Sequence, residues 1–189
     1  MVNIAIFASG SGTNAENIIK YFSNNQRVRI KSVYTNNSKA GVIERSEKWN
    51  IPVRNFSKGD LNNGEGFAKS LMTDNIHFIV LAGFLLLVPS EVIETYRNRI
   101  INIHPALLPL HGGKGFYGNN VHQAVINSGA IISGITIHHV NEKFDEGEII
   151  FQAACHVSHN ETPESLAKKI HELEYSYFPV VIEKITGNL

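Results

Sequence analysis

Short apolar runs alternate with amphipathic segments through the first hundred residues, and this order limits the possible folds more than any other feature. Five runs have the length and composition of buried strands: residues 3–7, 29–35, 51–56, 78–84 and 100–104. Four segments between them have helical spacing: residues 14–22, 40–49, 66–72 and 89–96. Such alternation produces right-handed βαβ units. We therefore predict an α/β fold with a Rossmann-like, mostly parallel twisted sheet and helices on both faces.

The second half of the chain departs from this alternation. A helix is predicted within residues 119–127, and two longer apolar runs follow at 132–140 and 148–157. Since no helical segment separates those two runs, we predict an antiparallel element late in the sheet. The length suits one domain with one core, so residues 1–189 are expected to form a single domain.

The last helix carries clear start signals. Thr162 is predicted as its N-cap, and Pro163 is expected in the first helical position, where the missing N–H costs nothing. Pro179 is expected to kink or end the helix. Its apolar stripe is predicted to consist of Leu166, Ile170, Leu173 and Tyr177.

Charge and composition exclude several classes of protein. The formal net charge is +0 at pH 7, so no basic field exists to attract nucleic acid. One cysteine, Cys155, allows no internal disulfide. The first ten residues lack the pattern of a signal peptide, and the apolar run at 78–89 is too short to span a bilayer. We expect a cytoplasmic protein with neither a nucleic-acid nor a membrane partner.

A glycine-rich turn at residues 7–17, "FASGSGTNAEN", follows the first strand and opens the first helix. Gly10 and Gly12 permit a tight turn and a close approach of the backbone. Thr13 and Glu16 have the spacing of a capping box, which would fix the start of the helix. Unpaired N–H groups and the positive end of the helix dipole would then face the turn, an arrangement that binds phosphate.

Three interpretations of this turn remain open. We favour a monophosphate site, with Ser11, Thr13 and Asn14 adding side-chain donors. A dinucleotide site would use Gly10, Gly12 and Ala15 as a G-x-G-x-x-A motif, but Asn36 stands where an acidic residue should hold a ribose. The turn could also be a glycine-rich connection that binds nothing.

Asn102 and His104 lie two apart on a predicted strand, so their side chains leave the same face. They stand at the carboxyl end of that strand, where open α/β sheets bind ligands. Asparagine offers a neutral donor, and histidine can donate or accept, so the pair could stabilise an oxyanion and move a proton in acyl transfer. The alternative is a purely structural role, in which His104 is a hydrogen-bonded core residue. Asp145 could orient the imidazole or could serve only its own turn.

Other chemistries find little support in the sequence. His138 and His139 adjoin on a strand and point to opposite faces, so they cannot jointly bind one metal. No zinc-type ligand spacing and no G-x-S-x-G motif is present. Cys155 lies in an apolar strand and is predicted to be a buried small hydrophobe. We expect direct transfer without a covalent enzyme intermediate and without a metal.

Several motifs occur in an order that resembles the folate-dependent phosphoribosylglycinamide formyltransferase family over nearly the whole chain. They are "SGSGTN" at 9–14, "VLAGF" at 80–84, "NIHPALLP" at 102–109, "KGFYG" at 114–118, "FDEGEII" at 144–150 and "HELEYSYFP" at 171–179. The resemblance implies the formyltransferase fold. It also implies transfer of a formyl group from 10-formyltetrahydrofolate, as co-substrate, to the amine of glycinamide ribonucleotide in de novo purine biosynthesis.

The resemblance assigns roles residue by residue. Catalytic positions are Asn102, His104 and Asp145. Ribonucleotide-binding positions are Gly12, Thr13, Asn14, His171 and Glu174. Folate-binding positions are Leu85, Leu86, Leu87, Val88, Asn102, Val140, Asn141, Phe144 and Asp145.

Three positions depart from the family pattern in ways that bear on folate affinity rather than on chemistry. Leu86 stands where arginine is frequent, Gly64 lies near a basic contact of some members, and Ala106 replaces the usual serine. His171 stands at a position whose polar residue varies in kind. The partners implied are the two small substrates, and the chain is expected to be a monomer or homodimer.

Several other functions are compatible with the same motifs. They are other users of 10-formyltetrahydrofolate, such as a deformylase, a methionyl-tRNA formyltransferase or a sugar N-formyltransferase, and a non-catalytic nucleotide-binding domain.

Residues 111–120 contain four glycines, so this loop is predicted to close over bound substrates. The alternative is a merely disordered connection.

Overall fold

The computed structural model describes residues 1–187, and this part of the chain contains a seven-stranded sheet in the order β3-β2-β1-β4-β5-β6-β7. The strands are β1 (Val2–Phe7), β2 (Val28–Thr35), β3 (Val53–Asn55), β4 (Phe78–Leu81), β5 (Ile100–His104), β6 (Ile132–His139) and β7 (Ile149–His156). The first five pair in parallel, whereas β6 is antiparallel to both β5 and β7. The predicted mostly parallel sheet with a late antiparallel element is confirmed.

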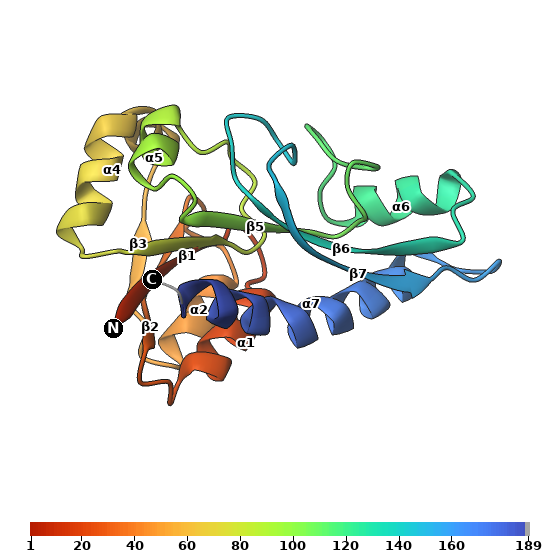
Figure 1. Cartoon of the computed structure of the whole chain (residues 1–189), viewed down its shortest axis with the longest axis horizontal. Helices are drawn as coiled ribbons and strands as arrows, with labels where there is room; N and C mark the ends of the chain where they lie inside the picture. Colours follow the sequence, from red (N-terminus) through yellow and green to blue (C-terminus); the bar gives the residue numbers. More distant parts are fainter. Residues whose placement is uncertain (188–189) are drawn as a thin grey trace.

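Helices cover both faces of the sheet (Figure 1). They are α1 (Thr13–Phe22), α2 (Val42–Glu47), α3 (Lys58–Asn62), α4 (Gly64–Thr73), α5 (Ser90–Thr95), α6 (Asn119–Asn127) and α7 (Pro163–Thr186). Figure 1 shows α4 and α5 on one side of the sheet, with α1, α2 and α7 on the other. The short helix α3, which was not predicted, begins with a capping box between Ser57 and Asp60. Within residues 1–187, none of the helices has the length and apolarity needed to cross a membrane.

The strand alternation decides which side chains reach each layer. Ile101 and Ile103 of β5 belong to the apolar cluster that includes α1, α6 and α7. Asn102 and His104 must therefore project from the opposite face. The antiparallel register places His138 of β6 directly beside Asn102. Three polar side chains thus share one face near the carboxyl end of β5.

The start of α1 differs from the predicted capping box. Gly12 is the N-cap, in the left-handed conformation with φ of 78°, and Thr13 is already the first helical residue. No side chain caps this helix, and the carboxylate of Glu16 pairs with Arg45. The predicted capping box is wrong because the helix begins directly after Gly12 without a side-chain cap. Glu16 is therefore free to form its ion pair with Arg45 of α2.

The start of α7 is as predicted, with Thr162 as cap and Pro163 in the first turn. The helix nevertheless runs through Pro179 to Thr186. A proline leaves the carbonyl four residues earlier without its helical donor, and that carbonyl, on Tyr175, accepts a hydrogen bond of 3.0 Å from Asn17 Nδ2. Of the two outcomes predicted for Pro179, an end to the helix is wrong, and α1 supplies the replacement donor that the continued helix needs.

The buried face of α7 also differs from the predicted stripe. Leu166 and Ile170 are fully buried, but Tyr177 is 39% exposed and its neighbour Phe178 is 0% exposed. Leu173 is only partly buried. Because 3.6 residues complete a turn, the buried face drifts from Ile170 to Phe178 and does not follow the aromatic residue at 177.

We predict that Phe178→Ala lowers the free energy of unfolding by about 3–5 kcal/mol, since it leaves a cavity between α7 and the sheet. Tyr177→Ala is the matched control and should cost about 1 kcal/mol, because it loses mainly a partly exposed ring contact with Phe151. Urea denaturation followed by circular dichroism measures both. Equal losses would contradict the assigned face.

Candidate active site

The turn between β1 and α1 is held from behind by α2. The carbonyl of Gly10 accepts from the N–H of Val42 at 3.2 Å, and the carbonyl of Ser11 accepts from Arg45 Nε at 3.0 Å. A Cβ on Gly12 would lie 2.5 Å from Val42, so the close approach requires glycine. With these carbonyls turned to α2, the N–H groups that open α1 have no helical acceptor and border a cavity.

Glu174 of α7 closes the far side of this turn. Its Oε2 accepts a hydrogen bond of 2.8 Å from Asn14 Nδ2, while Asn14 Oδ1 is buried without a partner. Burial raises the pKa of Glu174 to about 7, although the bond from Asn14 opposes the rise. His171, one helical turn earlier, borders the same cavity, and burial lowers its pKa. The predicted ribonucleotide residues therefore come together.

Asp145 lies at the centre of a second polar cluster, at the carboxyl end of β5. Its Oδ2 accepts from the N–H of Gly113 at 2.9 Å and lies 3.4 Å from His104 Nδ1. Its Oδ1 accepts from Asn102 Nδ2 at 3.4 Å and lies 3.6 Å from His138 Nε2. The structure thus brings the three predicted catalytic side chains into one cluster, although Asp145 lies in a loop 41 residues after His104.

The environment of Asp145 holds it as a carboxylate. Burial on its own would raise the pKa of the group, but His138 and His104, in the protonated forms that they take at acidic pH, together with the Gly113 N–H outweigh burial. The pKa therefore falls below its ordinary value. A partly buried negative charge is consequently available beside the His104 ring.

His104 is 3% exposed, and both of its ring nitrogens face oxygen acceptors. Nδ1 faces Asp145, and Nε2 lies 2.8 Å from the carbonyl oxygen of His111, to which it donates. Burial lowers the pKa of His104, while Asp145 and the His111 carbonyl oppose the shift. The ring is therefore neutral at rest, in surroundings whose two acceptors stabilise the imidazolium once a negative charge develops nearby.

His138 is a member of this cluster that the sequence analysis weighed only as a metal ligand. Its Nδ1 lies 2.8 Å from the carbonyl oxygen of His139, and its Nε2 lies 3.1 Å from Asn102 Nδ2. The backbone acceptor fixes the proton on Nδ1, so Nε2 accepts from Asn102. His138 joins the cluster through the antiparallel register that pairs it with Asn102. That register cannot be read from the sequence, so no sequence signal could have identified His138.

Asn102 consequently differs from its predicted orientation. Its Nδ2 group was expected to face an oxyanion, but at rest it donates to His138 and Asp145. The amide oxygen is the polar atom of this side chain that these bonds leave available. Asn102 is thus positioned to accept a hydrogen bond from a ligand.

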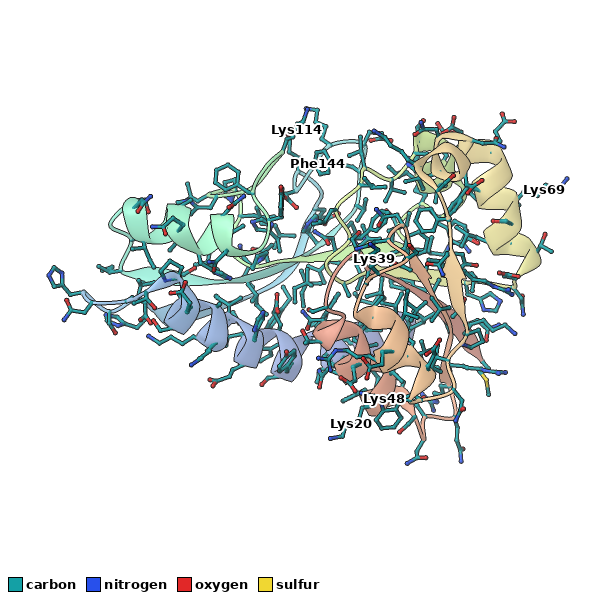
Figure 2. The ribbon with its side chains drawn as sticks, turned by 180° about the vertical axis from the view of Figure 1, so that it is seen from behind. Lys20, Lys39, Lys48, Lys69, Lys114 and Phe144 are labelled. Carbon is teal, nitrogen blue, oxygen red and sulfur yellow. The ribbon has the colours of Figure 1, made fainter. Side chains whose placement is uncertain are left out.

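One cavity of about 670 Å³ joins the two clusters, and every predicted site residue borders it. Its apolar wall consists of Leu85, Leu86, Leu87 and Val88 on one side and of Val140 and Phe144 on the other, where the polar Asn141 and Lys143 also border it. Lys114, Phe116 and Tyr117, from the loop predicted to close over substrates, also border it, as does His122, which was not predicted. Figure 2 labels Lys114 and Phe144, which extend on the same side of the ribbon from the β5–α6 and β6–β7 loops.

The remaining candidate positions lie away from this chemistry. Gly64 begins α4, where a Cβ would come within 2.3 Å of Glu91, and it is not part of the cavity wall. Ala106 is fully buried. Cys155 is half-buried rather than buried, and burial raises the pKa of its thiol. Among residues 1–187, no group of three or more histidine, cysteine or acidic side chains is arranged to hold a metal ion.

Comparison with known proteins identifies close relatives. Residues 2–182 match the formyl transferase family. Two curated relatives carry the name phosphoribosylglycinamide formyltransferase: the chloroplastic protein of Arabidopsis thaliana, at 42% identity over 94% of this chain, and that of Bacillus subtilis (strain 168), at 32% identity over 99%. The chain spans 63% of the Arabidopsis protein and 96% of the Bacillus one. The solved structure of phosphoribosylglycinamide formyltransferase from Bacillus halodurans superposes with a TM-score of 0.86 at 34% identity, covering 97% of this chain and 94% of that one.

The raised pKa of Glu174 predicts a pH-dependent cost to stability. The folded state holds the proton up to about pH 7, whereas an unfolded glutamate releases it near 4.5, so stability falls as pH rises through this window. Glu174→Gln should therefore be more stable than the parent protein by about 3 kcal/mol at pH 8 and nearly equal at pH 4.5. Urea denaturation at both pH values measures this.

The exposed Glu172 on the same helix provides the control, as Glu172→Gln should shift stability little at either pH. If Glu174→Gln showed no gain at pH 8 over pH 4.5, the carboxyl group would be ionised without cost and its assigned environment would be incorrect.

Proposed function

The chain belongs to the formyl transferase family, and from this premise we propose that it transfers the formyl group of 10-formyltetrahydrofolate to the amine of glycinamide ribonucleotide in de novo purine biosynthesis. The observation that carries the proposal is the single cavity that connects an amide-lined helix start with the Asn102, His104 and Asp145 cluster, beside an apolar wall. We propose that residues 1–189 act as one catalytic domain. A cytoplasmic location, small-molecule partners only, and a monomeric or homodimeric state stay predictions from the sequence.

The proposed ribonucleotide site runs from α1 to α7. Its phosphate would accept from the N–H groups and side chains of Gly12, Thr13 and Asn14 at the positive end of α1. Its ribose hydroxyls would reach Glu174, and His171 would flank them. The cavity includes this turn but not Asn36, which instead accepts from Ser9 Oγ at 2.6 Å. That geometry favours a monophosphate over a dinucleotide.

The proposed folate site is the apolar end of the same cavity. The ring system would lie between the segment from Leu85 to Val88 and the loop from Val140 to Phe144, where backbone groups can pair with its polar edge. In this arrangement the formyl group would lie between the folate wall and the Asn102–His104 pair. No metal is needed for the transfer as proposed.

The chemistry begins when the ribonucleotide amine attacks the formyl carbon, and the amide oxygen of Asn102 accepts from the amine to orient it. As the tetrahedral centre forms, its oxygen becomes negative and takes the place of the His111 carbonyl as acceptor for His104 Nε2. The developing charge favours the imidazolium, which Asp145 also stabilises. Collapse breaks the bond to the folate nitrogen, which receives the proton that the attacking amine loses, passed by way of His104 or a water beside Asp145.

An assay of folate release tests this function against its rivals. Release that depends on glycinamide ribonucleotide supports the proposal. Release without any acceptor would indicate a deformylase, and release only with an amino sugar or with methionyl-tRNA would indicate the other transferases. Binding of the ribonucleotide without any release would indicate a non-catalytic domain.

We predict that His104→Ala and Asp145→Asn each lower kcat by about a hundredfold or more, because each removes stabilisation that is largest in the transition state. The exposed His159, at a distance from the cavity wall, provides His159→Ala as a control with unchanged turnover. Circular dichroism establishes that the variants are folded. Turnover near the parent value in either cluster variant would refute the assigned roles.

The loop at residues 111–120 is proposed as a lid that pivots beyond Gly113. The N-terminal part of the loop is tied to the cluster through the His111 carbonyl and the Gly113 N–H, while Gly115 and Gly118 adopt positive φ. Limited proteolysis should show slower cleavage within 114–120 when the ribonucleotide and a non-reactive folate analogue are both present. Cleavage unaffected by both ligands together would show a connection that does not close.

A further inference from the structure

His122 of α6 is a buried imidazole that the reaction as described does not use. It is 4% exposed, yet it borders the cavity. Its Nδ1 is sealed from solvent and has no hydrogen-bond partner. Nε2 is not sealed in this way and has no hydrogen-bond partner within residues 1–187, so it is the nitrogen that faces the open volume of the cavity.

Packing does not account for a histidine at this position. Its neighbours on the helix, Val121 and Val125, are fully buried in the main apolar cluster. A leucine at 122 would satisfy the same surroundings without burying an unpaired polar atom, which costs stability. A residue that costs stability and borders a ligand cavity is expected to be retained for binding.

The ring is neutral and its proton has a preferred position. Burial, together with His171 and His104, lowers the pKa of His122 to about 4, so the ring carries no charge at neutral pH. A buried N–H without an acceptor is tolerated less well than a buried acceptor without a donor. The proton therefore resides on Nε2, and the ring presents a neutral donor to the cavity.

The position of His122 selects the part of the ligand that it meets. The helix α6 packs against α7, which carries His171 and Glu174 at the proposed ribose end. His104 at the reacting end is also close enough to influence the His122 ring. His122 thus stands between the ribose end and the reacting end of the cavity.

We propose that His122 Nε2–H donates a hydrogen bond to the amide carbonyl of the glycinamide arm and holds the terminal amine toward the formyl carbon. This inference rests on the proposed function, since it concerns the same ribonucleotide. It adds a substrate-binding residue from α6, an element that supplies none of the predicted contacts.

Calorimetric titration of glycinamide ribonucleotide into the full chain tests this contact. His122→Leu and His122→Asn should each raise Kd about tenfold, as expected for one lost hydrogen bond, because neither side chain places a donor where Nε2 lies. His122→Gln, whose amide nitrogen reaches the position of Nε2, should stay within about threefold of the parent protein. His122→Leu should also have an equal or higher Tm.

His139→Leu is the matched control, because His139 also has a buried, unpartnered Nδ1 but does not border the cavity. Its Kd should equal that of the parent protein. Parent-like Kd values in both His122→Leu and His122→Asn would overturn the inference while leaving the proposed function intact. Failure of the parent protein to bind the ribonucleotide would instead overturn the proposed function, and the inference with it.

Discussion

The carboxylate of Asp145 joins the parts of the molecule on which the site depends. It accepts from Gly113 in the loop after β5 and from Asn102 on β5, and it lies beside His104 and His138. One partly buried carboxylate thereby links two loops to two strands. The turn that carries it returns so close to β6 that a Cβ on Gly147 would lie 1.7 Å from the His139 carbonyl oxygen. Glycine at position 147 therefore allows the turn to pass close enough to β6 for the carboxylate to reach the cluster.

Burial and neighbouring groups decide which side chains around the cavity carry a charge. Burial favours the neutral forms of Glu174, His104 and His122, whereas its neighbours keep Asp145 ionised. The fixed polarity therefore comes from the helix start at α1, which attracts an anion, and from Asp145, which favours a cation beside it. A reaction that creates an oxyanion next to His104 converts this arrangement into an ion pair at the moment when charge develops. The folded protein bears the cost of burying these groups before substrate arrives.

The sequence predicted the sheet because apolar periodicity and strand length are local properties, and it predicted the convergence of Asn102 and His104 because β alternation is regular. The start of α7 followed from Thr162 and Pro163 for the same reason. The errors arose where distant residues decide the outcome. Arg45 takes Glu16 from the expected cap, and Asn17 satisfies the carbonyl that Pro179 leaves open. His138 and His122 were missed because strand register and helix packing bring them to the cavity, and neither is encoded in local spacing.

The central claim is that His104 and Asp145 act as one unit in the transition state, and a double-mutant cycle on turnover tests it most directly. Single-turnover rates would be measured for the parent protein, His104→Ala, Asp145→Asn and the double variant. If the carboxylate acts through the imidazole, Asp145→Asn should cost less than about threefold in the His104→Ala background. Losses that multiply in the double variant would show that the two groups act independently, and would contradict the account.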